Sequence, residues 1–512
     1  MDTHYRMKSE LEAATTPEAV CFEDRQSDGR LKVDRHGLPL VPQPSDNKDD
    51  PLNWPKPLKL AVLLQASLLT LMGTMGAATI NPAFVPLAAA FHITPVQASY
   101  ELTVWTVFGA VCPVLLVPLA NVYGRRPFYV LGNLLAAATN FAAGYCTTWS
   151  GVLATRALNG MGAGCATALG PATVVDLFFL HERGLFMGVY TFCVTNAPHF
   201  APLAGVITGT SIVARWSYIQ FGLFFVTYFC FPETLYSRQV DTALPTEVNK
   251  RPVRTYVGLL LFRTSGSGTR EQKLTLSAFA APFVMMRYLC VLLPALYYMT
   301  AFAYGSLLFG ATGSVVFRSL YGFNTAQTGL VISLPLVVGC FLGECSAGWF
   351  TDWLVYRAAR RRGDGVRRPE SRLDALWLAL LVPVGTVIQG VCISHAKSTG
   401  WAANAVGMAI ASFGLQVAGT VTYTYCTDKT LKCYKPQTAE ISAILSLIRL
   451  IYCSIVPFYA VPFAERIEYQ YAWLTFACIN IAFLLPMGFL RLYGDQIRKA
   501  KWQTMSKRHP NI

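Results

Sequence analysis

The sequence is poor in charged residues, which make up only 14% of its 512 positions. Soluble domains usually carry about 25% charged residues, and they rarely expose as much apolar surface as this composition would require. Hydrophobic residues account for 53% of the chain. A helix needs roughly 20 apolar residues to cross a bilayer, so we expect an all-α integral membrane protein with about twelve crossing helices.

Sequence motifs of nucleotide-driven pumps, metal proteins and disulfide scaffolds are missing. The 14 cysteines include no Cys-x-x-Cys pair, and most stand within apolar runs, where a thiol behaves as a small hydrophobic group. We therefore expect no disulfides and no metal site. No G-x-x-x-x-G-K-[ST] sequence occurs, so we do not expect ATP as the energy source. Neither a cofactor nor enzymatic activity is expected.

The net charge of +14 does not indicate a nucleic-acid-binding protein. The sequence has no zinc-finger spacing and no basic helix suited to reading bases. The cations gather instead in connections between apolar segments, where anionic lipid and the positive-inside rule favour them on the cytoplasmic side. The expected partners are the lipid bilayer, protons and a small-molecule substrate.

One short basic connection sets the orientation of the whole chain. Residues 118–127 join two apolar segments and contain Gly124 and the adjacent cations Arg125 and Arg126. A short basic turn between two membrane-length helices is typical of a cytoplasmic hairpin. With this turn in the cytoplasm, both termini are expected there as well.

This connection resembles the signature between the second and third helices of the major facilitator superfamily, which reads roughly G-x-L-a-D-r-x-G-R-R. The family glycine falls on Val117 and the family aspartate on Asn121, so the loop lacks its usual acidic partner. The resemblance implies two six-helix halves that open alternately to either side of the membrane. The matching positions are Leu119, Ala120, Gly124, Arg125 and Arg126.

Further motifs support the same resemblance. The expected fourth helix carries R-x-x-x-G-x-g-a, which begins at Arg156, and small residues at this spacing permit close helix contact in lipid. The loop after it resembles D-x-F-x-x-x-x-R-G, with Asp176 and Arg183 in place. A weak second copy of the first loop motif ends at Asp352, as expected for two halves related by an internal repeat.

The expected fifth helix resembles that of the fungal drug:proton antiporter branch, where it reads G-P-x-x-G-P-x-x-G-G. Pro198, Pro202 and Gly205 are retained, so the kinks of this helix are expected to survive. Three family glycines are replaced by alanine or valine, which predicts bulkier packing. A D-P-x-N-W-P lead-in before the first helix and a P-E-T-L sequence that contains Glu233 also resemble fungal transporters.

These motifs and changes in composition divide the chain. The first part is polar, rich in proline and without an early apolar run, so we expect a disordered tail there rather than a signal peptide. The expected parts are a cytoplasmic N-terminal tail at 1–57, six-helix bundles at 58–231 and 282–490, a central cytoplasmic loop at 232–281 and a cytoplasmic tail at 491–512.

Ionisable groups within a bilayer cost several kcal/mol, so each one is a functional candidate. Glu101 is a candidate proton carrier, because a carboxyl group in a low dielectric can titrate near neutral pH. The alternative is an interfacial side chain that reaches outside water. Arg156 would answer that carboxylate or an anionic substrate, or else make a structural hydrogen bond. The expected proton-coupling and cavity residues are Glu101, Arg156, Asn159, Asn196, His199 and Arg449.

The later candidates also have two interpretations each. Arg449 shares a helix face with Ser446, which predicts a cavity wall, whereas Glu440 points to the opposite face and should not pair with Arg449. Glu344 stands near the expected cytoplasmic end of its helix, where a role in a conformational lock is expected. His199 is either a substrate or proton contact or a packed histidine.

A second set of residues lies at the expected cytoplasmic ends of the helices. Such charges can pair when the inner mouth closes, and exchange of these pairs would bias the two halves between inward-open and outward-open states. The alternative is that they only determine topology. The members of this expected gate are Asn121, Gly124, Arg125, Arg126, Asp176, Arg183, Glu233 and Asp352.

The sequence therefore predicts a monomeric secondary transporter, most similar to proton-coupled exporters of drugs, toxins or secondary metabolites. One alternative is proton-coupled uptake of a polyamine or another cationic nutrient. A second alternative is a membrane receptor on the same fold that transports nothing. The plasma membrane is the expected location, with a vacuolar or other internal membrane as the alternative.

Overall fold

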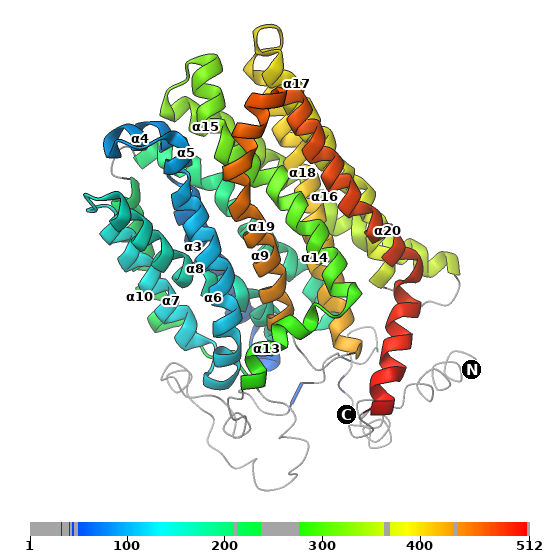
Figure 1. Ribbon diagram of the computed structural model, residues 1–512. Coiled ribbons are helices and arrows are strands. Elements are labelled where there is room, and N and C mark those ends of the chain that lie inside the picture. Colours follow the sequence, from blue (N-terminus) through cyan, green and yellow to red (C-terminus); the bar gives the residue numbers. More distant parts are fainter. Residues whose placement is uncertain are drawn as a thin grey trace.

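The computed structural model describes residues 50–208, 212–236, 276–362, 369–433 and 438–508, together with residues 32, 40, 44 and 45. These ranges consist mainly of helices, as the apolar composition predicts (Figure 1). The central loop expected at 232–281 and the N-terminal tail fall largely outside the described residues.

Six long helices form the first half of the described chain. The first long helix, α3, is preceded by η1 (Pro51–Asn53). It is followed by the short elements η2 (Asn81–Ala83), α4 (Phe84–Phe91) and α5 (Pro95–Ala98). The long helices are α3 (Lys56–Ala78), α6 (Tyr100–Tyr123), α7 (Arg126–Ala143), α8 (Trp149–Leu177), α9 (Leu180–Thr208) and α10 (Ile212–Cys230).

The second half begins with the short helix α13 (Leu276–Met285). A break separates it from α14 (Leu289–Phe302), which continues through the π-helical turn η6 (Ala303–Leu307) into α15 (Leu308–Tyr321). A π-helical turn is rare and frequently marks a functional position. The remaining elements are α16 (Thr325–Arg362), η7 (Pro369–Leu380), α17 (Leu381–Ser394), α18 (Ala396–Cys433), α19 (Thr438–Ile467) and α20 (Tyr469–Arg508).

Eight segments of the described chain are long and apolar enough to cross a membrane by length and composition alone. The helices α7 to α10 are not among them, but they pack within the same bundle: α8 against α6 and α7, α10 against α7, and α9 against α3. Polar and small residues such as Arg156, Asn159 and Gly160 lower the hydropathy of α8. The bundle accommodates them because most of this helix is surrounded by protein rather than by lipid. The tertiary packing therefore accounts for spans that composition alone does not recognise.

The two halves lie side by side, with the first-half helices in blue to teal and the second-half helices in green to red (Figure 1). Between the halves, α6 packs along α19 and α9 packs along α16. Leu447 of α19 contacts the hydrophobic cores on both sides of this boundary. The middle of α19 is thus part of the contact surface between the halves.

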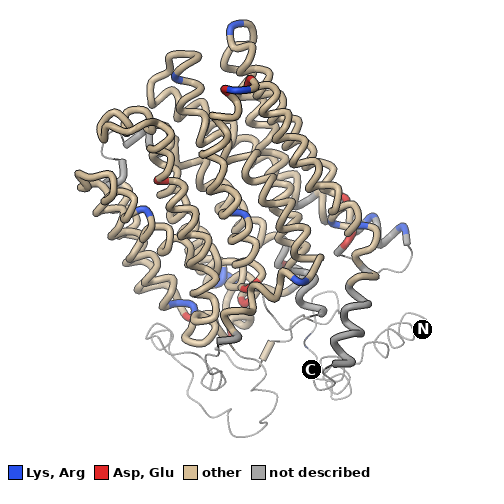
Figure 2. Tube along the Cα trace, viewed as in Figure 1, with Lys and Arg blue, Asp and Glu red and all other residues tan. Residues whose placement is uncertain are grey.

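The outer surface is apolar, and the charges avoid the middle of the bundle. Large apolar side chains such as Leu131, Leu185 and Leu485 are exposed on the helices, as expected for a surface covered by lipid. Most of the described charged residues lie at the ends of the helices, and only a few occur at mid-height (Figure 2). Those few are the ones that a membrane environment makes costly.

Candidate transport site

The carboxylate of Glu101 and the guanidinium of Arg156 meet inside the first half. The Oε2 atom of Glu101 on α6 lies 3.9 Å from Nε of Arg156 on α8, and both side chains are 0% exposed. Neither carboxylate oxygen of Glu101 has a hydrogen-bond partner among the described residues. The interpretation of Glu101 as an interfacial side chain in outside water is therefore wrong, because protein covers it completely.

Other contacts fix Arg156 in place. Its Nη1 donates to the carbonyl oxygen of Gly76 on α3 at 3.1 Å, and its Nη2 donates to Oδ1 of Asn140 on α7 at 2.9 Å. Asn140 in turn donates to Oε1 of Gln220 on α10 at 2.6 Å. Arg156 thus makes structural hydrogen bonds through Nη1 and Nη2 and faces a carboxylate through Nε, so both interpretations of this residue apply.

Asn159 is the second polar centre of α8. Its Oδ1 accepts a 2.9 Å hydrogen bond from Nε1 of Trp105, and its Nδ2 donates to the carbonyl of Ala136 at 2.9 Å and to Oγ1 of Thr139 at 3.2 Å. Trp105 is buried, and this bond orients its ring. Asn159 therefore ties α6 and α7 to α8 one turn away from Arg156.

Close backbone contacts make this network possible. A Cβ atom on Gly160 would lie 2.4 Å from the carbonyl oxygen of Trp105, and one on Gly162 would lie 2.5 Å from that of Gly132. The helix α8 is therefore wedged between α6 and α7 with glycine on both sides, as the small-residue pattern predicted.

His199 of α9 connects the two halves. Its Nε2 lies 2.7 Å from Oγ of Ser306 in the π-helical turn η6, and its Nδ1 lies 3.5 Å from Sγ of Cys340 on α16. Asn196, one turn earlier, donates to the carbonyl of Phe192 within its own helix at 3.0 Å. No sequence pattern pointed to Ser306, because its position depends on the π-helical turn.

Arg449 is a buried cation in the second half. It is 2% exposed, and its Nη1 donates to the hydroxyl oxygen of Tyr298 at 3.2 Å. Its guanidinium carbon lies 4.5 Å from the ring centre of Phe302 and 5.5 Å from that of Tyr298. As the helical spacing predicted, Arg449 does not pair with Glu440.

The basic loop at the expected cytoplasmic end has acidic partners after all. The guanidinium of Arg125 forms an ion pair with Asp176. The carboxylate of Glu233 accepts the backbone N–H groups of Arg125 and Arg126 at 3.0 and 3.1 Å. The family's usual acidic partner is absent, since Asn121 stands in its place, but Asp176 and Glu233 from elsewhere in the chain supply acidic groups to this loop. Gly124, at φ 101°, provides the backbone turn that aims these N–H groups.

Two members of the expected gate interact with Glu440 of the second half: Asn121 through a hydrogen bond and Arg125 electrostatically. The Nδ2 group of Asn121 on α6 donates to Oε1 of Glu440 on α19 at 2.9 Å. The bonds of Arg125, Arg126, Asp176 and Glu233 that we describe join parts of the first half. The side chains of Arg183 and Asp352 lie outside the described residues.

The helix α9 continues through Pro198, Pro202 and Gly205 to Thr208.

Glu344 on α16 is held by α18. Its Oε2 accepts hydrogen bonds from Nε2 of Gln416 at 2.5 Å and from Oγ1 of Thr420 at 2.8 Å. Its other oxygen, Oε1, lies 2.5 Å from the place that a Cβ atom on Gly188 of α9 would take. Glu344 is thus a half-buried carboxylate at the contact between the halves.

A bundle of membrane-spanning helices with two contacting halves and buried charged groups between its helices defines a multi-pass membrane transport protein. The sequence profile described as "Major Facilitator Superfamily" matches residues 66–460, so the chain belongs to this family. The protein is therefore a transporter of this superfamily and not an enzyme.

Individual relatives are more distant. The chain is 25% identical over 463 residues to "Efflux pump radE" of Floropilus chiversii. The aligned region covers 88% of this chain and 83% of the relative. It is 26% identical over 471 residues to "MFS-type transporter atr4" of Stereocaulon alpinum, with 90% and 82% covered.

Two solved structures share the fold. The human organic anion transporter MFSD10 (TETRAN) superposes with a TM-score of 0.58 at 15% identity, over 85% of this chain and all (100%) of that chain. An inward-facing, unoccupied bacterial homolog of the human lysosomal transporter Spinster superposes with a TM-score of 0.54 at 12% identity, over 87% and 99%. At these identities the likeness shows the fold alone.

Proposed function

We propose that this protein exports a small organic molecule, such as a drug, toxin or secondary metabolite, in exchange for protons by alternating access. The observation that carries the proposal is the buried pair of Glu101 and Arg156. A carboxylate in a low-dielectric interior costs several kcal/mol unless it is paired or protonated. Here it has one cation at 3.9 Å and no hydrogen bond among the described residues. A loosely held carboxylate of this kind is suited to bind and release a proton.

Protonation of Glu101 would change the contact between the halves through α6. Two residues beyond Glu101, the hydroxyl of Thr103 donates to the carbonyl of Ser454 on α19 at 3.3 Å. The ring of Tyr100 packs against that of Phe458, with centroids 4.9 Å apart. A neutral Glu101 no longer attracts Arg156, so the position of α6 relative to α8 and α19 can respond to the proton.

The polar contacts between the halves that involve described residues can be exchanged. They include Asn121 with Glu440, Thr103 with Ser454, and His199 with Ser306. Alternating access requires one bundle to rock against the other around a central site. Short polar contacts along an otherwise apolar boundary favour such motion, because each can be replaced by water or substrate.

The direction of transport rests on similarity. The name of one relative, "Efflux pump radE", supports export. The altered glycines of α9 keep the alternative of proton-coupled uptake open, since the retained prolines do not by themselves determine direction. A receptor without transport is the third possibility. We further propose that the protein acts as a monomer in the plasma membrane with both termini in the cytoplasm.

Inside-out vesicles with an acidic lumen test these functions. A pH-sensitive dye in the lumen reports proton exit while compounds are added outside. An exporter predicts that a transported compound enters the vesicles and accelerates the loss of luminal protons. A polyamine importer predicts instead that spermidine loaded in the lumen leaves together with protons. Neither result occurs for a receptor. The control is the Glu101→Gln protein, in which the gradient should drive neither movement.

A further inference from the structure

Arg449 differs from Arg156 in lacking an acidic partner. Arg156 has Glu101 at 3.9 Å, whereas no described carboxylate lies within ion-pair distance of Arg449. The ionisable neighbours that interact with Arg449 are phenols and one thiol, those of Tyr190, Tyr298, Tyr423 and Cys453. An uncompensated guanidinium in a membrane interior costs several kcal/mol, so its retention calls for an anion.

Some hydrogen-bonding groups at and near Arg449 have no partner among the described residues. Its Nε has no partner among the described residues, although the side chain is 2% exposed. Ser446, one turn earlier on the same face of α19, is 0% exposed, and its hydroxyl also lacks a partner among the described residues. Buried donors without acceptors are rare in folded proteins. Two of them on one helix face indicate that a ligand supplies the acceptor.

The place of Arg449 in the fold suits a transport substrate. Tyr298 and Phe302 on α14 cover one side of the guanidinium, and the ring of Tyr423 on α18 meets that of Tyr298 at 5.7 Å between centroids. Tyr190 of α9, in the other half, interacts electrostatically with both Arg449 and Tyr423. The group therefore lies where the two halves meet, beside Leu447, and not in the interior of one bundle.

We infer that the substrate is an organic anion that carries a carboxylate beside an aromatic or apolar body, and that Arg449 binds this carboxylate. The inference rests on the transport function proposed above. A guanidinium presents N–H donors in a planar fork that matches both oxygens of a carboxylate. The rings of Tyr298, Phe302 and Tyr423 supply a surface for the apolar body. A polyamine would meet a cation here, which argues against the uptake alternative.

The test measures binding to the full-length protein in detergent with three probes that share one ring system. These are 2-naphthoate, 2-naphthamide and 2-naphthylmethylammonium, which differ in charge but little in size. Thermal stabilisation gives the apparent affinity of each probe. We expect 2-naphthoate to bind about tenfold or more tightly than the other two, which corresponds to about 1.4 kcal/mol.

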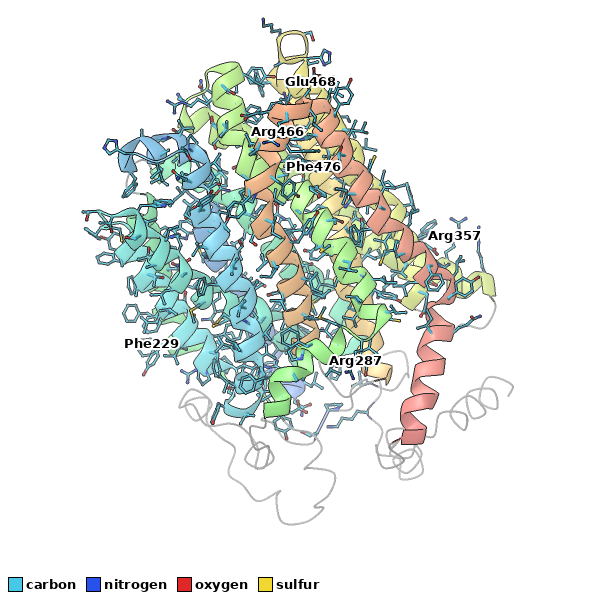
Figure 3. All side chains as sticks on the ribbon, in the orientation of Figure 1. Phe229, Arg287, Arg357, Arg466, Glu468 and Phe476 are labelled. Atoms are coloured by element: carbon cyan, nitrogen blue, oxygen red, sulfur yellow. The ribbon has the colours of Figure 1, made fainter. Side chains whose placement is uncertain are left out.

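Variants assign this preference to Arg449. In Arg449→Met the preference for 2-naphthoate should disappear. In Arg449→Lys a part should remain, because the charge stays while the planar fork is lost. Arg466→Met is the matched control, since Arg466 stands exposed near the far end of the same helix (Figure 3) and should bind like the original protein. Arg449→Met without ligand should melt no lower than Arg449→Lys, because it buries no unpaired charge.

Three results would overturn the inference. The first is equal or tighter binding of the amine or the amide, the second is unchanged 2-naphthoate binding by Arg449→Met, and the third is no binding of any probe at millimolar concentration. The assay uses no proton gradient, so it can succeed while proton-coupled export fails, and the reverse also holds. The two proposals are therefore tested separately.

Discussion

Asn121 on α6 donates a 2.9 Å hydrogen bond to Oε1 of Glu440 on α19, and so joins the two halves at the end that carries the basic loop. The major facilitator signature has an aspartate at the position of Asn121. In this chain an aspartate there would face another carboxylate. The amide is therefore the partner that Glu440 requires, and the departure from the signature has a structural reason.

Replacing Asn121 with aspartate should loosen this end of the bundle. Two carboxylates at hydrogen-bonding distance repel each other unless one takes up a proton. We expect Asn121→Asp to destabilise the contact by about 1 to 3 kcal/mol. Hydrogen–deuterium exchange should then become faster at the adjoining ends of α6 and α19. The double variant Asn121→Asp/Glu440→Gln should restore slow exchange, and unchanged exchange in the single variant would contradict the role of this contact.

Neutralising Glu101 should uncouple transport from protons. In Glu101→Gln the side chain keeps its size but no longer titrates, so the pH gradient should lose its effect on substrate accumulation. Exchange of labelled for unlabelled substrate should continue, because it needs no net proton movement. Both rates can be followed in the same vesicles. Gradient-driven accumulation that survives in Glu101→Gln would move the proton site elsewhere, with the half-buried carboxylate of Glu344 as the next one to test.

Removing Glu233 should destabilise the first half rather than change transport. Its carboxylate accepts the backbone N–H groups of Arg125, Arg126 and Leu235 at 2.9 to 3.1 Å. Without it these donors lose their charged acceptor, and we expect Glu233→Ala to lower the free energy of unfolding by about 2 to 4 kcal/mol. A fall in melting temperature would show this. Glu465→Ala, at an exposed position of α19, is the control and should melt unchanged.

A single methyl group on Gly160 should disrupt the packing of α8. The new Cβ would lie 2.4 Å from the backbone carbonyl oxygen of Trp105, which cannot move without shifting α6. Overpacking of this kind costs about 1 to 3 kcal/mol. We expect Gly160→Ala to give less monodisperse protein and a lower melting temperature. Gly222→Ala is the matched control, because nothing lies within 4 Å of its added methyl group.

Much of the fold could be read from the chain. The scarcity of charge, the apolar runs and the basic turn at Gly124 predict a multi-pass helical bundle, since lipid admits few other arrangements. The motif around Arg156 and Gly160 predicted close helix contact, and the structure has it. The opposite directions of Arg449 and Glu440 also followed from helical spacing alone.

Other parts could not be predicted, because they depend on pairs of residues far apart in the sequence. Asp176 and Glu233 were expected in one gate with the basic loop, but only the fold shows that Asp176 pairs with the side chain of Arg125 and that Glu233 accepts backbone N–H groups of the loop. The bond between His199 and Ser306 spans 107 positions and requires the π-helical turn.

Sequence by itself determined that this protein is a helical membrane transporter, because its apolar runs and basic turn require a helical bundle in lipid and its motifs match one transporter superfamily. Tertiary structure alone decided which buried charges are satisfied. Glu101 has Arg156 beside it, whereas the described neighbours of Arg449 are aromatic rings, phenols and a thiol, with no carboxylate within ion-pair distance. That difference depends on which helices touch, and no local pattern along the chain contains it.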